Sequence, residues 1–215
     1  MRALVLSVLL ALGAPAAAQE DVPPARWDHR DESDAWSRAA IAALKAHGSD
    51  LVDMTPEDIG VWCPAYGAAP DADRRAFWVG FLSALAKFES TWRPEAVGGG
   101  GQWYGLLQIL PATARQYGCR ATTGNALLDG ASNLSCAIRI MAETVPRDRA
   151  IMGDGAEGVA ADWAPLRVPT KRRDMRDWLM QQEYCRMEES RRPKPRPTEI
   201  ARREAGPQDA PPGPD

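Results

Sequence analysis

The hydrophobic positions of the chain repeat with helical spacing in several separate stretches. Apolar residues three and four apart predict a helix over residues 36–47, a clearer one over 71–88, and another from about residue 129. Two further helices are predicted over residues 111–118 and roughly 172–188. Long alternating strands are missing, so the pattern predicts a mainly helical protein.

The N-terminal end differs from this helical region. Residues 1–18 combine an early arginine, an apolar run and a final triplet of alanines, which is typical of a cleaved secretory signal. The apolar run is shorter than the ~20 residues that a membrane span needs. We therefore expect an extracytoplasmic protein, periplasmic in a bacterium, with no stable membrane insertion after the signal is removed.

Composition outside the helices sets the domain boundaries. Residues 19–33 form a polar lead, and residues 189–215 are rich in Arg, Pro and Gly with few apolar side chains, which predicts a disordered, solvated tail. The basic first part of the tail could instead touch an anionic polymer. A chain of 215 residues has room for one substantial core, so we expect one domain over residues 34–188.

Charge and ligand chemistry exclude two classes of function. Lys and Arg number 26 against 29 Asp and Glu, which gives a net charge of -3 and no basic field for nucleic acid. The two histidines and four cysteines show no zinc-site spacing. The sequence therefore predicts no nucleic-acid partner and no zinc site.

The four cysteines predict two disulfides, because disulfides form in oxidising extracytoplasmic compartments. Three pairings are possible. We favour Cys119 with Cys136, since they flank a short polar loop whose closure would contribute ~3 kcal/mol in the loop-entropy model. That pairing leaves Cys63 with Cys185, which would tie an early loop to the last predicted helix.

One carboxylate continues the apolar stripe of the helix over residues 71–88. Trp78, Leu82, Leu85 and Glu89 fall at i, i+4, i+7 and i+11, and so share a face. Burial beside tryptophan and the negative end of the helix dipole both raise the pKa of such a carboxyl, as a general acid requires. The alternative is a frayed helix end, with Glu89 in water and paired with Arg93.

The segment that follows, residues 98–111, has the composition of a cleft. Its four successive glycines allow the backbone to approach a ligand, and Trp103 and Tyr104 offer flat aromatic faces. Gln108 stands in an otherwise apolar run and needs a hydrogen-bond partner if it is buried.

Two blocks of residues carry a resemblance to a known family. Glu89-Ser90 and Pro94 are followed by residues 105–114, Gly-Leu-Leu-Gln-Ile-Leu-Pro-Ala-Thr-Ala. They resemble the Glu-Ser, proline and Gly-Leu-Met-Gln-Ile-x-Pro-x-Thr-Ala of the soluble-type lytic transglycosylases. A weaker match to the family's Asn-[Ile/Leu]-x-x-Gly-x-x-Tyr-Leu begins at Asn133. The resemblance implies a mainly α, lysozyme-like single domain, with a small β-hairpin or loop beside the cleft.

The sequence departs from the family pattern in two places. Tyr104 stands where the family usually has serine, and the family's Ala-Tyr-Asn-Ala-Gly block is absent. Residues 159–165, which include Trp163, are its nearest counterpart. In the family, these positions include a tyrosine that partners the catalytic acid and part of the sugar contacts, and this sequence does not match the family there.

The resemblance implies a reaction on the glycan strands of peptidoglycan. Such an enzyme is a lyase that cleaves the β-1,4 bond between N-acetylmuramic acid and N-acetylglucosamine and forms a 1,6-anhydro product. It would use Glu89 as the single catalytic carboxyl, without metal or cofactor; protein partners remain unknown. The substrate-binding residues implied are Ser90, Trp103, Tyr104, Gln108, Asn133 and Trp163.

Two alternatives stay open from the sequence. A hydrolytic muramidase would need a second acid near the sugar. A catalytically lapsed module for wall binding or secretion would keep the fold and lose the reaction, and the missing Tyr-Asn block motivates this alternative. The acids nearest in sequence for the muramidase are Glu95, Asp129, Glu143 and Asp162.

Overall fold

The computed structural model describes residues 21–187, which leaves the predicted signal (1–18) and the predicted tail (189–215) outside the described residues. The described chain is mainly helical with one small antiparallel sheet, as predicted. The α-helices are α1 (Ser33–Lys45), α2 (Ser49–Asp53), α3 (Asp71–Glu89), α4 (Pro111–Gln116), α5 (Gly124–Leu127), α6 (Gly130–Asp148), α7 (Val159–Asp162) and α8 (Pro169–Leu179). The 3₁₀ helices are η1 (Ile59–Val61), η2 (Tyr66–Ala68), η3 (Ala164–Arg167) and η4 (Glu183–Cys185), and the strands are β1 (Val97–Gly98) and β2 (Trp103–Tyr104).

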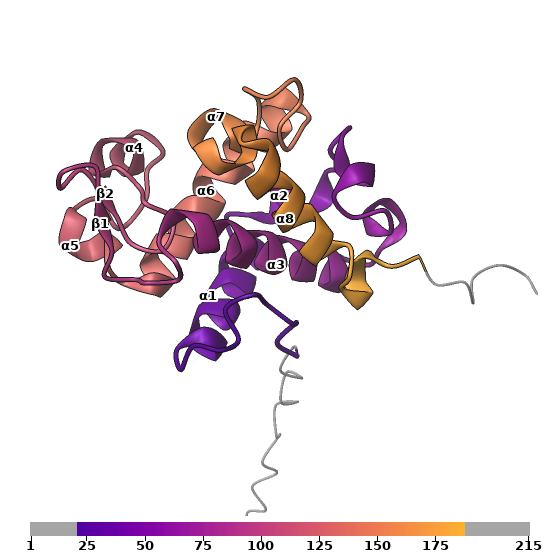
Figure 1. Ribbon diagram of the computed structural model, residues 1–215, viewed down its shortest axis with the longest axis horizontal. Coiled ribbons are helices and arrows are strands. Elements are labelled where there is room, and N and C mark those ends of the chain that lie inside the picture. The colour runs from indigo at the N-terminus through magenta and orange to yellow at the C-terminus, as the bar shows by residue number, and fades with distance from the viewer. Residues whose placement is uncertain (1–20, 188–215) are drawn as a thin grey trace, which may run out of the picture.

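Helix α3 runs through the middle of the fold (Figure 1). Helices α1, α2, α8 and η4 all contact it, and α6 packs against α1 and α2. Asp71 and Asp73 place negative charge in its first turn, where the helix dipole stabilises it. Every residue from Ala76 to Ala86 is buried, so α3 is enclosed on all sides rather than along one face. Its C-terminal end is therefore a rigid place for a functional side chain.

Aromatic side chains from several elements form the centre of the core. Phe81 of α3 meets Trp62 edge to face with ring centroids 5.4 Å apart, and Phe77 meets Tyr66 in the same way at 5.2 Å. Trp78 packs edge to face on both phenylalanines, at 5.0 and 5.5 Å. The indole N–H of Trp78 donates to the Tyr66 hydroxyl at 2.9 Å, so these two buried polar groups are paired. The core also reaches into the predicted polar lead, because Trp27 is fully buried.

Both favoured disulfides are present, Cys119–Cys136 and Cys63–Cys185. The helix predicted over residues 172–188 is wrong at its end, since α8 stops at Leu179 and Cys185 lies in η4. Tyr184 explains the difference. It packs so closely on Gly80 of α3 that any Cβ there would overlap its hydroxyl, and the chain must leave the helical path to reach that position.

The chain between α1 and α3 contains a helix, α2, that the hydrophobic pattern did not predict. Helix α1 ends at Lys45 with Ala46 as its C-cap, and α2 begins directly after Gly48. Asp58 directly precedes η1, and its carboxylate accepts the backbone N–H groups of Ile151 and Met152 at 2.8 and 2.9 Å. Within residues 21–187, no helix has the length and apolar character to span a membrane.

Candidate active site

Glu89 is the last residue of α3 and is partly buried. Loss of hydration raises the pKa of its carboxyl to about 7, while the positive charge of Lys171 acts in the opposite direction. Trp78, Leu82 and Leu85, which precede it on the predicted stripe, are fully buried. The carboxyl therefore holds a proton over part of the neutral pH range and can both give and accept one.

A tight turn behind Glu89 fixes the end of the helix. Ser90 is buried, its hydroxyl donates to the Ala86 carbonyl at 3.3 Å, and it accepts the backbone N–H of Arg93 at 3.2 Å. Thr91 and Trp92 both adopt positive φ, which is uncommon outside glycine. The Trp92 indole N–H donates to the Ser83 carbonyl of α3 at 2.8 Å, so the chain folds back along the helix it has just left. Ser90 thus supports the site from behind.

The predicted hairpin is present next to this turn. Strands β1 and β2 pair Val97 with Tyr104 and Gly98 with Trp103, and the three glycines between them have positive φ. Figure 1 shows the hairpin with α4 and α5 at one end of the molecule. Gln108 holds the base of the hairpin, because its side-chain amide donates to the carbonyls of Ala96 and Gly105 at 3.1 and 2.9 Å.

Asn133 of α6 holds the same loop from the other side. Its amide donates to the carbonyls of Tyr104 and Leu127, and its carbonyl accepts the N–H of Leu107, all at 2.9 Å. A Cβ on Gly105 would overlap with Asn133, so this close approach requires glycine. Asn133 is fully buried, and its side-chain hydrogen bonds are made to the backbone of this loop.

The three aromatic residues predicted to contact sugar differ in exposure. Trp103 is 46% exposed and lies across the Gly99 backbone. Tyr104 is half-buried against Gly124, and its hydroxyl donates to the Gly101 carbonyl at 2.7 Å. Trp163 is buried and its indole N–H donates to the Leu107 carbonyl at 3.0 Å, so it braces the loop and offers no open face. Trp103 is thus the aromatic platform that the hairpin presents.

Sequence reasoning missed Lys171, which lies in the first turn of α8. Its ammonium is 5.6 Å from the centre of the Phe88 ring, and Phe88 directly precedes Glu89 in the chain. Among the described residues it is the charged side chain that acts on the Glu89 carboxyl. No local signal marks Lys171, because its role depends on the packing of α8 against α3.

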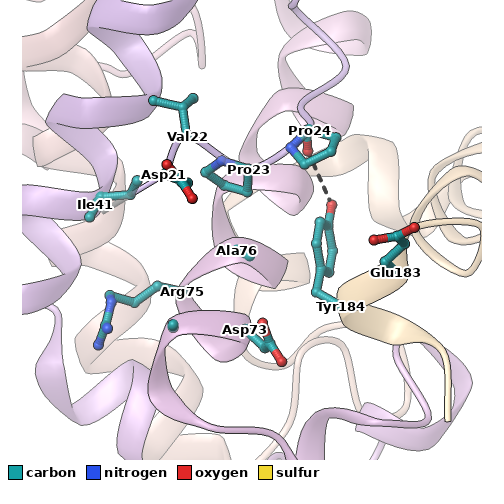
Figure 2. Close-up of a pocket in the computed structure, with 11 residues that line it drawn as sticks. Asp21, Val22, Pro23, Pro24, Ile41, Asp73, Arg75, Ala76, Glu183 and Tyr184 are labelled. Atoms are coloured by element: carbon teal, nitrogen blue, oxygen red, sulfur yellow. Dashed lines mark hydrogen bonds between the residues drawn. The ribbon is translucent and has the colours of Figure 1, made fainter. Parts of the chain in front are cut away.

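A cavity of about 530 Å³ lies at the other end of α3. It is lined by the segment that precedes α1, by Asp73, Arg75 and Ala76 of α3, and by Tyr184 (Figure 2). At ~1.5 Å rise per residue, Asp73 and Glu89 are about 24 Å apart along the helix. The cavity is therefore separate from the candidate site.

The raised pKa of Glu89 makes stability depend on pH. The pKa of this group is higher in the folded protein than the ordinary 4.5, so the folded state holds the proton more tightly. The stability that this contributes is complete below pH 4.5 and is lost as pH rises to about 7. We expect Glu89→Gln to raise the free energy of unfolding at pH 8 by up to roughly 3 kcal/mol and to change it little at pH 4.

Urea denaturation of both proteins at the two pH values measures this difference. All other titrating groups are shared, so they cancel between the variant and the wild type. Glu95→Gln, a substitution of an exposed neighbour, serves as the matched control and should show no such pH dependence. An equal effect of Glu89→Gln at pH 4 and pH 8 would mean that the carboxyl is hydrated.

The fold and the position of Glu89 together identify the structural class of the protein. A helical domain with a central helix that ends on one sheltered glutamate, beside a small glycine-rich hairpin, has the architecture of the lysozyme-like domains. The family model "Transglycosylase SLT domain" matches residues 69–150, and the chain belongs to this family. The comparison with curated proteins found no match.

Solved structures of one protein, Bd0314 DslA, are similar over the whole of their length. A DslA mutant with glutamine in place of a glutamate is 32% identical to this chain and superposes with a TM-score of 0.70. The match covers 79% of this chain and 100% of the DslA chain. Wild-type DslA in its form 2 is 32% identical with a TM-score of 0.68, over the same shares of both chains. A second glutamate-to-glutamine mutant is 31% identical, also with a TM-score of 0.68.

Proposed function

We propose that this protein is a peptidoglycan lytic transglycosylase in which Glu89 is the single catalytic carboxyl. The observation that carries the proposal is the position of Glu89, partly buried at the end of a rigid helix with a pKa of about 7. A group with this pKa can donate a proton in one step and accept it in the next at neutral pH. Proteins of the SLT family act on peptidoglycan, which gives the substrate class.

The reaction would proceed in two steps. Protonated Glu89 donates its proton to the glycosidic oxygen, the bond to C1 of N-acetylmuramic acid breaks, and the oxygen of that sugar's own N-acetyl group attacks C1. The Glu89 carboxylate then removes the proton from the C6 hydroxyl, whose oxygen displaces the acetyl oxygen at C1. This closes the 1,6-anhydro ring, restores the protonated acid and consumes no water.

The charges around Glu89 favour this route over two-carboxylate hydrolysis. Ordinary glycosidases use a second carboxylate as nucleophile or base. Within residues 21–187, the charge that acts on the Glu89 carboxyl is that of the cation Lys171. A substrate that supplies its own N-acetyl nucleophile needs no second acid.

Exposed groups around the hairpin would contact the glycan strand. Trp103 would stack on a sugar ring, because its face is open and sugars present apolar C–H groups to aromatic rings. Ser90, Gln108 and Asn133 would act indirectly, since each spends its hydrogen bonds on the backbone of the turn or loop. Of the six residues predicted to bind substrate, this assignment makes Trp103 a direct contact and Ser90, Gln108 and Asn133 supports.

The proposal also locates the protein outside the cytoplasm. Peptidoglycan lies there, the two disulfides suit an oxidising compartment, and residues 1–18 have the composition of a secretory signal. Export would release the mature chain near residue 19.

The product distinguishes lytic cleavage from hydrolysis. We expect digestion of purified sacculi to yield fragments ending in 1,6-anhydro sugars, which are one water lighter than hydrolytic products and resist borohydride reduction. Mass spectrometry of a digest in ¹⁸O-water measures this directly, with a hydrolytic muramidase on the same sacculi as the reference. Incorporation of ¹⁸O at the new ends would show that water is the nucleophile and would reject the anhydro mechanism.

A further inference from the structure

Lys171 lies at the edge of the candidate site, where its positive charge acts on the Glu89 carboxyl from beyond ion-pair distance. Its side chain is partly exposed, and none of the ion pairs within residues 21–187 includes it. Its ammonium lies 5.6 Å from the centre of the Phe88 ring, and the ammonium of Lys87 lies 5.1 Å from the centre of the same ring. Two cations thus flank the residue that precedes Glu89.

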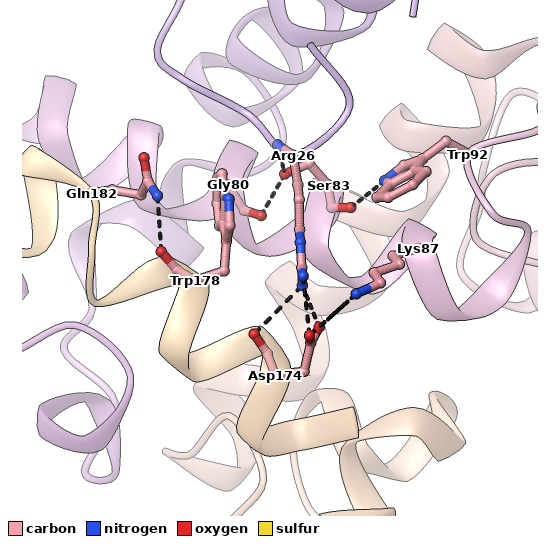
Figure 3. Close-up of polar contacts among 8 residues, drawn as sticks. All are labelled: Arg26, Gly80, Ser83, Lys87, Trp92, Asp174, Trp178 and Gln182. Carbon is pink, nitrogen blue, oxygen red and sulfur yellow. Dashed lines mark hydrogen bonds and ion pairs between the residues drawn. The ribbon is translucent and has the colours of Figure 1, made fainter. Parts of the chain in front are cut away.

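The obvious partner for Lys171 is occupied. Asp174 lies three residues further along α8, a spacing at which side chains meet. Its carboxylate instead accepts hydrogen bonds from the Arg26 guanidinium, at 3.1 Å for Nη2, and from Lys87 Nζ, at 3.1 and 3.2 Å (Figure 3). The Arg26 and Lys87 contacts lower the pKa of Asp174, so it stays ionised and committed to them.

The contacts of Asp174 hold α8, the helix that carries Lys171, against α3. The backbone N–H of Arg26 donates to the Ser83 hydroxyl of α3 at 2.8 Å, and Ser83 also accepts the Trp92 indole through its carbonyl. Figure 3 shows these groups converging from the N-terminal segment, α3 and α8. Asp174 therefore joins the N-terminal segment, α3 and α8, and its partner in α3, Lys87, lies two residues before Glu89. This arrangement fixes the first turn of α8 beside the acid.

We propose that Lys171 binds a carboxylate of the glycan-strand substrate next to the bond that Glu89 would cleave. The inference rests on the proposed function, since it concerns the same site. Peptidoglycan carries carboxylates in two places: on its stem peptides and, where the peptide has been removed, on the lactyl group of N-acetylmuramic acid. A charge-assisted hydrogen bond from an ammonium to either is stronger than a neutral one.

Charge compensation explains why the site would keep a cation near its acid. In the free protein, the positive charge opposes protonation of Glu89. A substrate carboxylate on Lys171 would cancel that charge and favour the protonated acid at the moment when the proton is needed. By linkage, the protonated acid and the bound carboxylate stabilise each other.

Binding to a protein that cannot cleave tests the inference. In the Glu89→Gln background, soluble glycan strands are titrated against the parent and against Lys171→Met, Lys171→Arg and Arg173→Met. We expect Lys171→Met to weaken binding roughly 10- to 100-fold, as the loss of a charge-assisted contact predicts. Lys171→Arg keeps the charge and should retain most of the affinity. Arg173 is exposed on the same helix, so Arg173→Met controls for the loss of one positive charge.

Three ligands separate the two sources of the carboxylate. The first carries stem peptides, the second has been stripped by an amidase and exposes lactyl carboxylates, and the third is the stripped strand with those groups converted to neutral methylamides. A Lys171→Met effect on the first ligand alone identifies the stem peptide, and an effect on the second identifies the lactyl group. The same loss on the neutral strand, no loss on any strand, or no binding by the parent overturns the inference.

Cleavage by the protein with Glu89 intact separates this result from the proposed function. If the protein with Glu89 intact leaves sacculi uncut, while binding in the Glu89→Gln background still depends on Lys171 and on a substrate carboxylate, the proposed function fails and the inference stands. If it cuts sacculi while Lys171→Met binds all three ligands like the parent, the inference fails and the proposed function stands. Equal melting temperatures for the four proteins confirm that each is folded.

Discussion

Replacing Glu89 by glutamine is expected to lower kcat/KM for peptidoglycan cleavage by about a thousandfold or more. Glutamine has nearly the same shape and cannot donate or remove a proton at neutral pH, and a positioned general acid contributes ~10²–10⁴-fold. Because a single carboxyl would serve both steps, its loss should stop both. Zymography and release of soluble fragments from purified sacculi measure the effect.

Glu95→Gln is the matched control for this loss. Glu95 is exposed in the loop before β1 and is one of the acids that a two-carboxylate muramidase could use. Under the proposed mechanism it should keep wild-type activity. A comparable loss in both variants would favour the muramidase, and equal cleavage by the wild type and Glu89→Gln would show that Glu89 is not the acid.

A third result is informative about the missing Ala-Tyr-Asn-Ala-Gly block. If neither the wild type nor Glu89→Gln cleaves sacculi, the domain is a lapsed member of its family. The segment that replaces the block gives Trp163 to the core, where its N–H supports the Leu107 carbonyl. The indole of Trp163 is thus committed to the loop and does not take the role of the family's tyrosine beside the acid.

The sequence predicted those features that are determined by residues close together in the chain. The acids at residues 71 and 73 and the apolar spacing that follows predicted α3, and Pro111 predicted the start of α4. Glu89 stood out because a carboxylate continued a stripe of buried side chains. The short polar loop between Cys119 and Cys136 favoured the observed disulfide. Each inference needed only spacing within one element or across one loop.

Features set by long-range packing were out of reach. Asn133 and Trp163 are residue types that bind sugars, and only the fold shows that both spend their hydrogen bonds on the loop around Leu107. Lys171 meets Phe88 across 83 positions of sequence, and Arg26 meets Asp174 across 148. No periodicity connects such pairs, since they come together only when α8 packs on α3.

The second large effect concerns the disulfide between Cys63 and Cys185. In the loop-entropy model, stabilisation grows with the length of chain that the bond encloses. The sequence separation is 122 residues for Cys63–Cys185 and 17 for Cys119–Cys136. We expect the double substitution Cys63→Ala and Cys185→Ala to lower the free energy of unfolding by about 5 kcal/mol, and the matched Cys119→Ala and Cys136→Ala by about 3 kcal/mol.

Urea denaturation at pH 6, with the wild type in the presence and absence of a reductant, measures both effects. Alanine is used at these positions because all four cysteines are buried and a serine hydroxyl would need a new partner. An equal or reversed order of the two losses would contradict the entropic account and would point to native-state packing as the source of stability.

Loss of the Cys63–Cys185 bond should also reach the candidate site by a definite route. The bond holds η4, which places Tyr184 against Gly80 of α3 and follows directly after α8. With η4 released, α8 would depend on the contacts of Asp174 with Arg26 and Lys87 to keep Lys171 beside Glu89. Hydrogen exchange should therefore show faster opening of α8 than of α6 in this variant, while removal of the Cys119–Cys136 bond should leave α8 unchanged.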